Sequence, residues 1–281
     1  MESAARHFQD KNALGFGGGK GIGKAVVVEW ARRGARVAIA DIDLAAARET
    51  SAEIVSLGGC AIALEADVTS EASISAAIAE TEAVFGDIDI LMNNVGAALN
   101  GNPEDIPLSE WMRITDLNYL GTVRAVTALL PKMLARGTGH IVNTASFAGL
   151  YPYAASRMPY AASKAAVIAL SESLALYLEP QGIRVSCLIP GPVVTDFMAS
   201  MTSWTKDCPI RGPGSEFKVM MPAEVGVVLA DAMAAGQILV PSDDAVWKTL
   251  EQWAKSPDRF IKGKIDDFAR GEAGMPVIAN A

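Results

Sequence analysis

The stretch Gly17-Gly18-Gly19-Lys20-Gly21-Ile22-Gly23 decides the fold of this chain. A short apolar run, residues 12–16, precedes it and predicts a strand, while residues 22–33 follow with the period of an amphipathic helix. Glycines between a strand and a helix let backbone amides approach a pyrophosphate at the positive end of the helix. The stretch therefore predicts a dinucleotide-binding βαβ unit rather than a glycine-rich turn that binds nothing. The contacts expected from it are Gly17, Lys20, Gly21, Ile22 and Gly23.

The same alternation of short apolar runs and helical segments continues along the chain. Further strands are predicted at 36–40, 61–65, 88–92, 140–144, 184–189 and 237–240, and helices at 44–57, 70–85, 108–134, 160–178 and from 223 onward. Pro131 should bend or end the helical stretch in which it lies. Successive βαβ units build a parallel sheet, so the fold class is α/β, a doubly wound parallel sheet of Rossmann type.

The last third of the chain departs from this alternation. Residues 196–222 contain four methionines, Trp204 and Phe217 without a clear period, and we interpret them as a mobile apolar flap over the substrate. Residues 242–281 read as a C-terminal helical extension. Without an internal repeat or a low-complexity linker, residues 1–281 are predicted to form a single domain.

Composition excludes several classes of protein. Of 281 residues, 51% are hydrophobic and 20% charged, which is typical of a globular protein, and a net charge of −8 argues against a nucleic-acid partner. The odd set Cys60, Cys187 and Cys208 suggests neither disulfides nor zinc, and His7 and His140 lie far from any acidic cluster, so no metal is expected. No signal peptide or membrane-spanning run is evident, and we expect a cytoplasmic protein without a membrane partner.

Two residues bear on the choice between NAD and NADP. Asp41 ends the second predicted strand, where its carboxylate can accept hydrogen bonds from the ribose hydroxyls of an adenosine and would repel a 2′-phosphate. Lys20 favours the opposite choice, because an ammonium beside the turn can hold a 2′-phosphate. We give Asp41 more weight, since no arginine follows it, and expect NAD rather than NADP. A solvated aspartate at the end of a strand and a solvated lysine are the plain alternatives.

Tyr160 and Lys164 can form an acid–base pair. They lie four residues apart on one predicted helix, which places both side chains on the same face. A phenol titrates near pH ~10, so it needs a nearby positive charge, such as the Lys164 ammonium, to exchange protons at neutral pH. Ser146 follows the fifth strand at the carboxyl edge of the sheet, where its hydroxyl can bond a substrate oxygen. Hydrolase chemistry is not expected, because the sequence has no Gly-x-Ser-x-Gly and no histidine placed to activate Ser146.

Four motifs together resemble the short-chain dehydrogenase/reductase family over roughly residues 8–240. They are Gly17-x-x-x-Gly21-x-Gly23, Asn93-Asn94-Val95-Gly96, Ser146, and Tyr160-Ala-Ala-Ser-Lys164. The resemblance implies a nicotinamide cofactor and a catalytic set matching Asn118, Ser146, Tyr160 and Lys164. In that set Tyr160 is the acid and base, and Asn118 steers a water toward the lysine. A helix-kinking or capping asparagine is the alternative for Asn118.

The resemblance also implies further cofactor contacts. It places Asp67 and Val68 at the adenine ring, Asn94, Val95 and Gly96 at the adenosine ribose, and Val193 and Thr195 at the nicotinamide carboxamide. Tyr160 and Lys164 are also expected to contact the cofactor. Plain strand-end turns and a stiff proline turn are the alternatives at these positions. The resemblance further implies a homodimer or homotetramer formed through the helices of residues 108–134 and 160–178.

The first strand departs from the family pattern. Phe16 stands where the family usually has threonine, and Gly15 lies inside a strand that should be rich in β-branched residues. This weakens the predicted strand and puts in question the hydrogen bond that ties the glycine turn to the Asn93 region. After the last core strand, Pro241-Ser242-Asp243-Asp244 replaces the family's paired glycines.

These observations predict an enzyme that moves a hydride between NAD and a secondary alcohol or ketone. The Met-rich flap with Trp204 favours a bulky apolar or aromatic small-molecule substrate. Two other functions stay open: a non-catalytic NAD(H)-binding sensor or scaffold, and an epimerase or dehydratase on the same fold.

Overall fold

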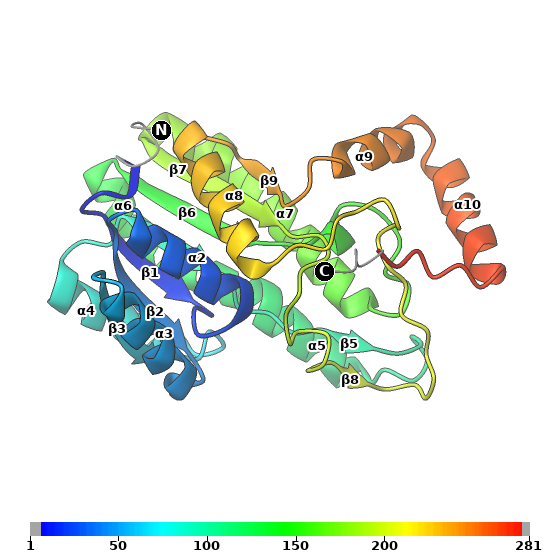
Figure 1. The fold of residues 1–281 in the computed structure, drawn as a ribbon, viewed down its shortest axis with the longest axis horizontal. Helices are drawn as coiled ribbons and strands as arrows, with labels where there is room; N and C mark the ends of the chain where they lie inside the picture. Colours follow the sequence, from blue (N-terminus) through cyan, green and yellow to red (C-terminus); the bar gives the residue numbers. More distant parts are fainter. Residues whose placement is uncertain (1–6, 277–281) are drawn as a thin grey trace.

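A seven-stranded parallel sheet forms the centre of the molecule, described here by a computed structural model of residues 7–276 (Figure 1). The strand order is β3-β2-β1-β4-β6-β7-β9. The strands are β1 (Asn12–Phe16), β2 (Arg36–Asp41), β3 (Cys60–Glu65), β4 (Ile90–Asn93), β6 (Gly139–Thr144), β7 (Ile183–Ile189) and β9 (Leu239–Pro241). All neighbouring pairs run parallel, so the predicted Rossmann-type fold class is confirmed.

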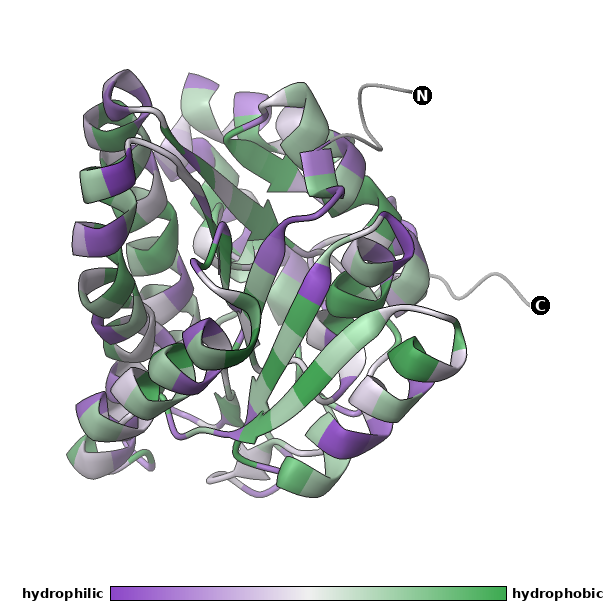
Figure 2. Ribbon diagram, turned by 90° about the vertical axis from the view of Figure 1, so that its left-hand side faces the viewer, coloured by the Kyte–Doolittle hydropathy of each residue, from purple (hydrophilic) through white to green (hydrophobic). Residues whose placement is uncertain are grey.

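Helices cover both faces of this sheet (Figure 1). On one face lie α2 (Gly21–Arg32), α3 (Leu44–Ser56) and α8 (Pro222–Ala235), and α2 and α8 share the first apolar core. On the other lie α4 (Glu71–Phe85), α6 (Gly121–Arg136) and α7 (Met158–Leu178), which share the second. The hydrophobic residues concentrate in the strands between these layers (Figure 2), as expected for a parallel sheet buried on both faces.

Gly15 strengthens the packing of β1 rather than weakening the strand. β1 is buried along its whole length and pairs in register with both β2 and β4, so the expectation of a weak first strand is wrong. A Cβ on Gly15 would lie 2.8 Å from Cγ1 of Val27. The missing side chain therefore lets α2 approach the strand more closely than a β-branched residue would allow.

The strand order reverses between β1 and β4, and this reversal positions the site. The chain starts at β1, moves outward to β3, and returns to β4 on the other side of β1. The helices that follow β1 and β4, α2 and α6, consequently cover opposite faces of the sheet, and the carboxyl edge at this reversal is the crevice in which an open α/β sheet usually binds its ligand.

Three local features differ from the sequence predictions. α6 continues through Pro131 to Arg136 and is capped by Gly137, whose φ is 66°, so of the two expectations at the proline, a bend or an end, the end is wrong. The predicted helix 108–134 is three pieces: α5 (Leu108–Thr115), a π-helical turn η1 (Asp116–Leu120) and α6. A small second sheet joins β5 (Leu99–Asn100) to β8 (Thr202–Ser203), within the predicted flap. Short strands and π turns leave little trace in a sequence period.

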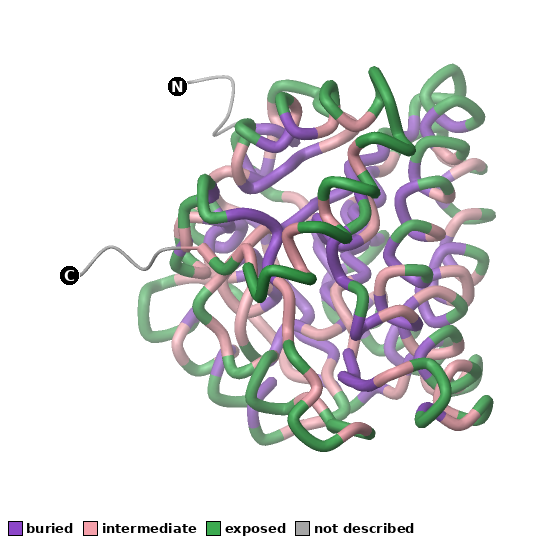
Figure 3. The backbone as a smooth tube through the Cα atoms, turned by 90° about the vertical axis from the view of Figure 1, so that its right-hand side faces the viewer, coloured by how far each residue is buried: buried purple, intermediate pink, exposed green. Residues whose placement is uncertain are grey.

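The C-terminal extension packs against the flap. Its helices, α9 (Val246–Lys255) and α10 (Pro257–Ala269), lie beyond the carboxyl edge of the sheet (Figure 1). The amides of Gly212 and Gly214 donate to the carbonyls of Ala273 and Gly274, at 2.8 and 2.9 Å. Figure 3 views this side of the molecule, where much of the chain is exposed or half-buried. The extension therefore holds the flap segment rather than standing apart from it.

A pair of histidines lies at the opposite, amino-terminal edge of the sheet. Nδ1 of His140 is 3.3 Å from Nε2 of His7, and Nε2 of His140 is 3.0 Å from the Ser186 hydroxyl. Burial, together with the positive charge of Arg184, lowers the pKa of His7 from 6.5 to about 4 and that of His140 to about 3. Both imidazoles are therefore neutral in the folded chain.

We expect the free energy of unfolding to fall as the pH is lowered from 7 to 5. The folded pKa of His140 lies below its unfolded value, so unfolding takes up a proton in this window and acid favours the unfolded chain. His140 alone should contribute a loss of about 2 kcal/mol. Urea unfolding at the two pH values measures it, and His140→Gln should reduce the difference. An equal pH dependence in that variant would contradict the assignment.

Candidate active site

Tyr160 and Lys164 share one face of α7, one turn apart, as predicted. Both are buried, and Nζ of Lys164 lies 5.9 Å from the centroid of the Tyr160 ring. The ammonium donates to the carbonyl of Thr144 at 2.8 Å, which ties α7 to the end of β6. Since α7 packs along β7, the helix carries both side chains to the carboxyl edge of the sheet.

Ser146 reaches the same place from the turn after β6. Its hydroxyl accepts a hydrogen bond from the Ala148 amide at 3.2 Å, capping a short 3₁₀ turn, η2 (Phe147–Gly149). The Tyr160 phenol interacts with the same hydroxyl. A serine hydroxyl retains its own proton to donate. Ser146 can therefore orient a substrate oxygen beside Tyr160.

Asn118 is the centre of the π-helical turn η1. It is fully buried, and its side chain exchanges two hydrogen bonds with the backbone of Ala97, at 2.8 and 2.9 Å. Its amide also donates to the hydroxyl of Ser163, on the helix that carries Lys164. The position joins η1, the turn after β4 and α7, so Asn118 has a structural task beside any role in a proton path.

Burial shifts both members of the Tyr160–Lys164 pair toward their neutral forms. It raises the pKa of Tyr160, an effect opposed by the hydrogen bond with Ser146 and the positive charge of Arg157. It lowers the pKa of Lys164 to about 8. Because burial favours the neutral form of both side chains, a further charge beside them would change their pKa values. The site can thus hold or release a proton near neutral pH when a ligand changes its electrostatics.

The glycine turn is closely tied to its neighbours. The Asn94 side-chain amide donates to the carbonyl of Gly17 at 3.0 Å, and the Asn94 backbone amide donates to the carbonyl of Phe16. The tie between the turn and β4 that was in question with Phe16 is therefore made by Asn94. A Cβ on Gly23 would lie 1.9 Å from the carbonyl oxygen of Gly17. Only glycine fits there, and α2 can begin against the turn with its amides directed to the crevice.

Asp41 lies at the turn, where the sequence placed it. Its carboxylate accepts the backbone amides of Gly19 and Asp43, at 2.9 and 3.0 Å, one on each oxygen. Each oxygen has a second lone pair, so two further donors can still be accepted. Lys20 forms an exposed ion pair with Asp43, with 2.7 Å between Nζ and Oδ2. The ammonium that could attract a 2′-phosphate is thus already paired with a carboxylate.

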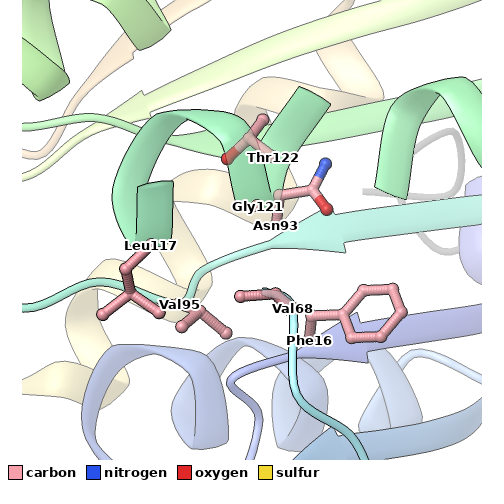
Figure 4. Close-up of a pocket in the computed structure, with 7 residues that line it drawn as sticks. All are labelled: Phe16, Val68, Asn93, Val95, Leu117, Gly121 and Thr122. Atoms are coloured by element: carbon pink, nitrogen blue, oxygen red, sulfur yellow. The ribbon is translucent and has the colours of Figure 1, made fainter. Parts of the chain in front are cut away.

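The remaining predicted cofactor residues fall into two groups. The Asp67 carboxylate accepts the amide and hydroxyl of Thr69, which is a turn role. The side chains of Val68 and Val95 line a hollow with Phe16 and Leu117 that has no room for a water molecule (Figure 4). Their side chains belong to the apolar packing at the edge of the crevice, and only their backbone remains for a ligand.

The segment with Val193 and Thr195 closes the other side of the crevice. Val193 bridges to Met220, and the Val194 amide donates to the carbonyl of Met220. A Cβ on Gly21 would lie 3.5 Å from Cγ2 of Thr195. Thr195 therefore faces the glycine turn across the crevice. A Cβ on Gly96 would lie 3.1 Å from Nζ of Lys164, so the backbone of Gly96 packs against the ammonium.

Comparison with known proteins agrees with this arrangement. The sequence profile of the family described as short chain dehydrogenase matches residues 11–206. The chain belongs to the short-chain dehydrogenase family.

The chain is 44% identical to a sorbitol dehydrogenase of Cereibacter sphaeroides over 65% of this chain and 70% of that one. It is 33% identical to a cyclohexanol dehydrogenase of an Acinetobacter species over 88% of this chain and 93% of the other. A solved short-chain dehydrogenase from Novosphingobium aromaticivorans superposes with a TM-score of 0.75 at 28% identity, over 94% and 97% of the two chains. The protein is an oxidoreductase of this family.

Sequence reasoning did not anticipate two residues of this short-chain dehydrogenase. Tyr153 is buried, and its phenol interacts with both Ser146 and Arg157. Arg157 is 8% exposed, three residues before Tyr160. An arginine directly before the helix that carries Tyr160 and Lys164 is a signal that could have drawn attention to it.

Two further features of the short-chain dehydrogenase concern metals and membranes. Among residues 7–276, no cluster of three or more His, Cys, Asp and Glu side chains could hold a metal ion. Within the same range, the segment 158–181, which includes α7, is long and apolar enough to cross a membrane. Because α7 packs against β7 and carries Tyr160 and Lys164, we interpret it as a core helix of the domain.

Proposed function

We propose that this short-chain dehydrogenase uses NAD to interconvert a bulky secondary alcohol and its ketone. The convergence of Tyr160, Lys164 and Ser146 at the carboxyl edge carries the proposal, because it supplies an acid–base group, a cation and an orienting hydroxyl within one buried site. The residues around the crevice fit a dinucleotide: the glycine turn presents amides at the start of α2, and Asp41 retains free lone pairs.

The residues of the site divide the chemistry between them. When bound, the nicotinamide supplies the hydride acceptor or donor. Ser146 holds the substrate oxygen by a hydrogen bond, and Tyr160 takes the hydroxyl proton during oxidation or returns it to the oxygen during reduction. Lys164 favours the phenolate by its charge. Asn118 fixes the turn after β4 beside the ammonium and, in this proposal, positions a water toward it.

Aromatic side chains favour a bulky substrate. Tyr160 lies 5.6 Å from Phe197 between ring centroids, and Tyr151 packs with Tyr153 and Phe217. Phe197 and Phe217 come from the flap, residues 196–222, which we propose covers the substrate. Met198 and Trp204 remain 39% and 40% exposed, and are available to close on an apolar ring.

We expect the Asp41→Ala variant to lose the preference for NADH over NADPH that we propose for the wild type. The variant removes the carboxylate that accepts the ribose hydroxyls, and hydrogen bonds to a charged group contribute about 1.5–3 kcal/mol, so NADH affinity should fall by roughly tenfold or more. NADPH affinity should fall less or rise, because the repulsion of the 2′-phosphate is also removed. Tryptophan fluorescence titration with each cofactor measures both.

Asp43→Asn is the matched control, since it removes a neighbouring charge but retains an oxygen for the Ala46 amide. It should change NADH affinity little. Tighter binding of NADPH than NADH by the wild type, abolished in Lys20→Gln, would contradict the proposed cofactor.

We also propose that the protein is a cytoplasmic homodimer or homotetramer assembled through α5 and α7. Leu108 and Met112 on α5 are 74% and 64% exposed, and Leu176 and Tyr177 on α7 are 82% and 62% exposed. The two helices are in contact, and each of them has exposed apolar side chains. A second copy of the chain would cover them. Sedimentation velocity of the intact chain distinguishes a dimer or tetramer from a monomer.

A further inference from the structure

Arg157 is a buried cation without a counter-ion in the described structure. Its side chain is shielded at the start of α7, and Nη2 donates to the carbonyl of Arg211 at 2.6 Å. Nε is buried with no hydrogen-bond partner. Within residues 7–276, no carboxylate forms an ion pair with this guanidinium, whereas other arginines, such as Arg33, Arg113 and Arg124, pair with carboxylates.

A buried guanidinium without a counter-ion destabilises the folded state. Buried charges in proteins are normally paired, because the loss of hydration is not recovered from neutral neighbours alone. The partners of the guanidinium are the carbonyl of Arg211, the phenol of Tyr153 and the ring of the same tyrosine, whose centroid is 5.7 Å from Cζ of Arg157, and none of them carries a negative charge. The donors left over suit a planar, bidentate anion such as a carboxylate.

The guanidinium belongs to the substrate side of the site. It contacts Tyr153, whose phenol interacts with Ser146, and its charge acts on the phenol of Tyr160. Its bonded carbonyl, that of Arg211, is in the flap. Arg157 therefore lies under the flap, close to the residues that hold the substrate oxygen.

The two buried charges of the site, those of Arg157 and Lys164, are both positive. Lys164 is the second buried cation, and the amino end of α7 adds a partial positive charge at Arg157 itself. The acid that acts on this aromatic group is Glu216, which affects Tyr151; it is exposed, and its carboxylate lies against Gly214. A neutral substrate would leave the buried charge uncompensated, whereas an anionic one would neutralise it.

We propose that Arg157 binds a carboxylate of the substrate, so that the enzyme acts on ring-bearing hydroxy acids or keto acids whose alcohol carbon lies at Tyr160. The proposal rests on the proposed function, and adds to it the class of substituent, a carboxylate, that Arg157 selects. Arg157 orients the substrate through this second contact, and the aromatic side chains enclose the ring between the two ends.

The test compares two ketones that differ by one carboxylate. Wild type, Arg157→Gln and Arg157→Lys are assayed with NADH and either 4-oxocyclohexanecarboxylate or cyclohexanone. We expect the wild type to prefer the keto acid, and the ratio of the two kcat/KM values to fall roughly tenfold to a hundredfold in Arg157→Gln, as for a lost charge-assisted hydrogen bond. Arg157→Lys should retain part of the preference. Arg48→Gln, an exposed arginine on α3, is the control and should leave the ratio unchanged.

Binding gives a second measurement that does not need turnover. Cyclohexanecarboxylate is titrated into the NADH complexes of wild type and Arg157→Gln, with tryptophan fluorescence as the signal. Weaker binding to the variant by the same factor supports the proposal.

A structural role of Arg157 would lower both kcat/KM values by one factor and leave the ratio unchanged, and that result would overturn the proposal. If neither ketone is reduced although NADH binds, the proposed reaction fails for these ketones, and the binding measurement alone decides on Arg157. Equal binding to both proteins, or no binding to the wild type, then refutes the carboxylate site.

Discussion

Tyr160→Phe is expected to lower kcat for ketone reduction by about a hundredfold to ten-thousandfold, the usual contribution of general acid–base catalysis. The substitution removes the phenolic oxygen but keeps the ring that packs 5.6 Å from Phe197, so the apolar contacts of the site remain. Without the phenol, the proposed donor of a proton to the forming alkoxide is missing from the Tyr160–Lys164 pair. Stopped-flow or steady-state NADH absorbance with a cyclic ketone measures the loss.

The measurement needs a control for cofactor binding and a matched variant. NADH affinity should change less than threefold, because the glycine turn and Asp41 lie on β1 and β2, away from the phenol. Tyr153→Phe is the matched variant: its phenol also interacts with Ser146, yet it is not part of the Tyr160–Lys164 pair. A much smaller loss is expected there. Full turnover by Tyr160→Phe would mean that another group transfers the proton, and would remove the basis of the proposed function.

Gly23→Ala is expected to abolish cofactor binding and to destabilise the fold by about 3 kcal/mol or more. The added Cβ would lie 1.9 Å from the Gly17 carbonyl oxygen and 2.5 Å from Nδ2 of Asn94. Both are held by the hydrogen bond between them, so neither can move without opening the turn. Urea unfolding and NADH titration measure the two effects.

Gly263→Ala provides the control for a methyl group added to a glycine. Gly263 lies inside α10, and a Cβ there would meet nothing within 4 Å. Alanine favours a helix over glycine by about 1 kcal/mol, so this variant should be unchanged or slightly more stable, with NADH binding intact. Unimpaired NADH binding by Gly23→Ala would show that the turn is not the cofactor site.

Local patterns were sufficient for the fold and for much of the site. The glycine turn, the spacing to Asp41 and the four-residue separation of Tyr160 and Lys164 follow from strand and helix geometry alone. Such features act over one turn or one βα unit, where sequence distance and spatial distance are nearly the same. The seven core strands were predicted within about two residues for the same reason.

The sequence by itself determined a parallel α/β sheet with a tyrosine–lysine pair at its carboxyl edge, because period, turn chemistry and helix spacing are local properties of the chain. Only the tertiary structure decided how distant segments meet. It brought Asn94 to Gly17 in place of the missing threonine, let Gly15 admit Val27, and carried Arg211 from the flap onto Arg157. The burial that leaves Arg157 without a counter-ion, and shifts the pKa values of Tyr160 and Lys164, results from packing among these segments. Burial is a property of the whole fold, and no spacing within one segment encodes it.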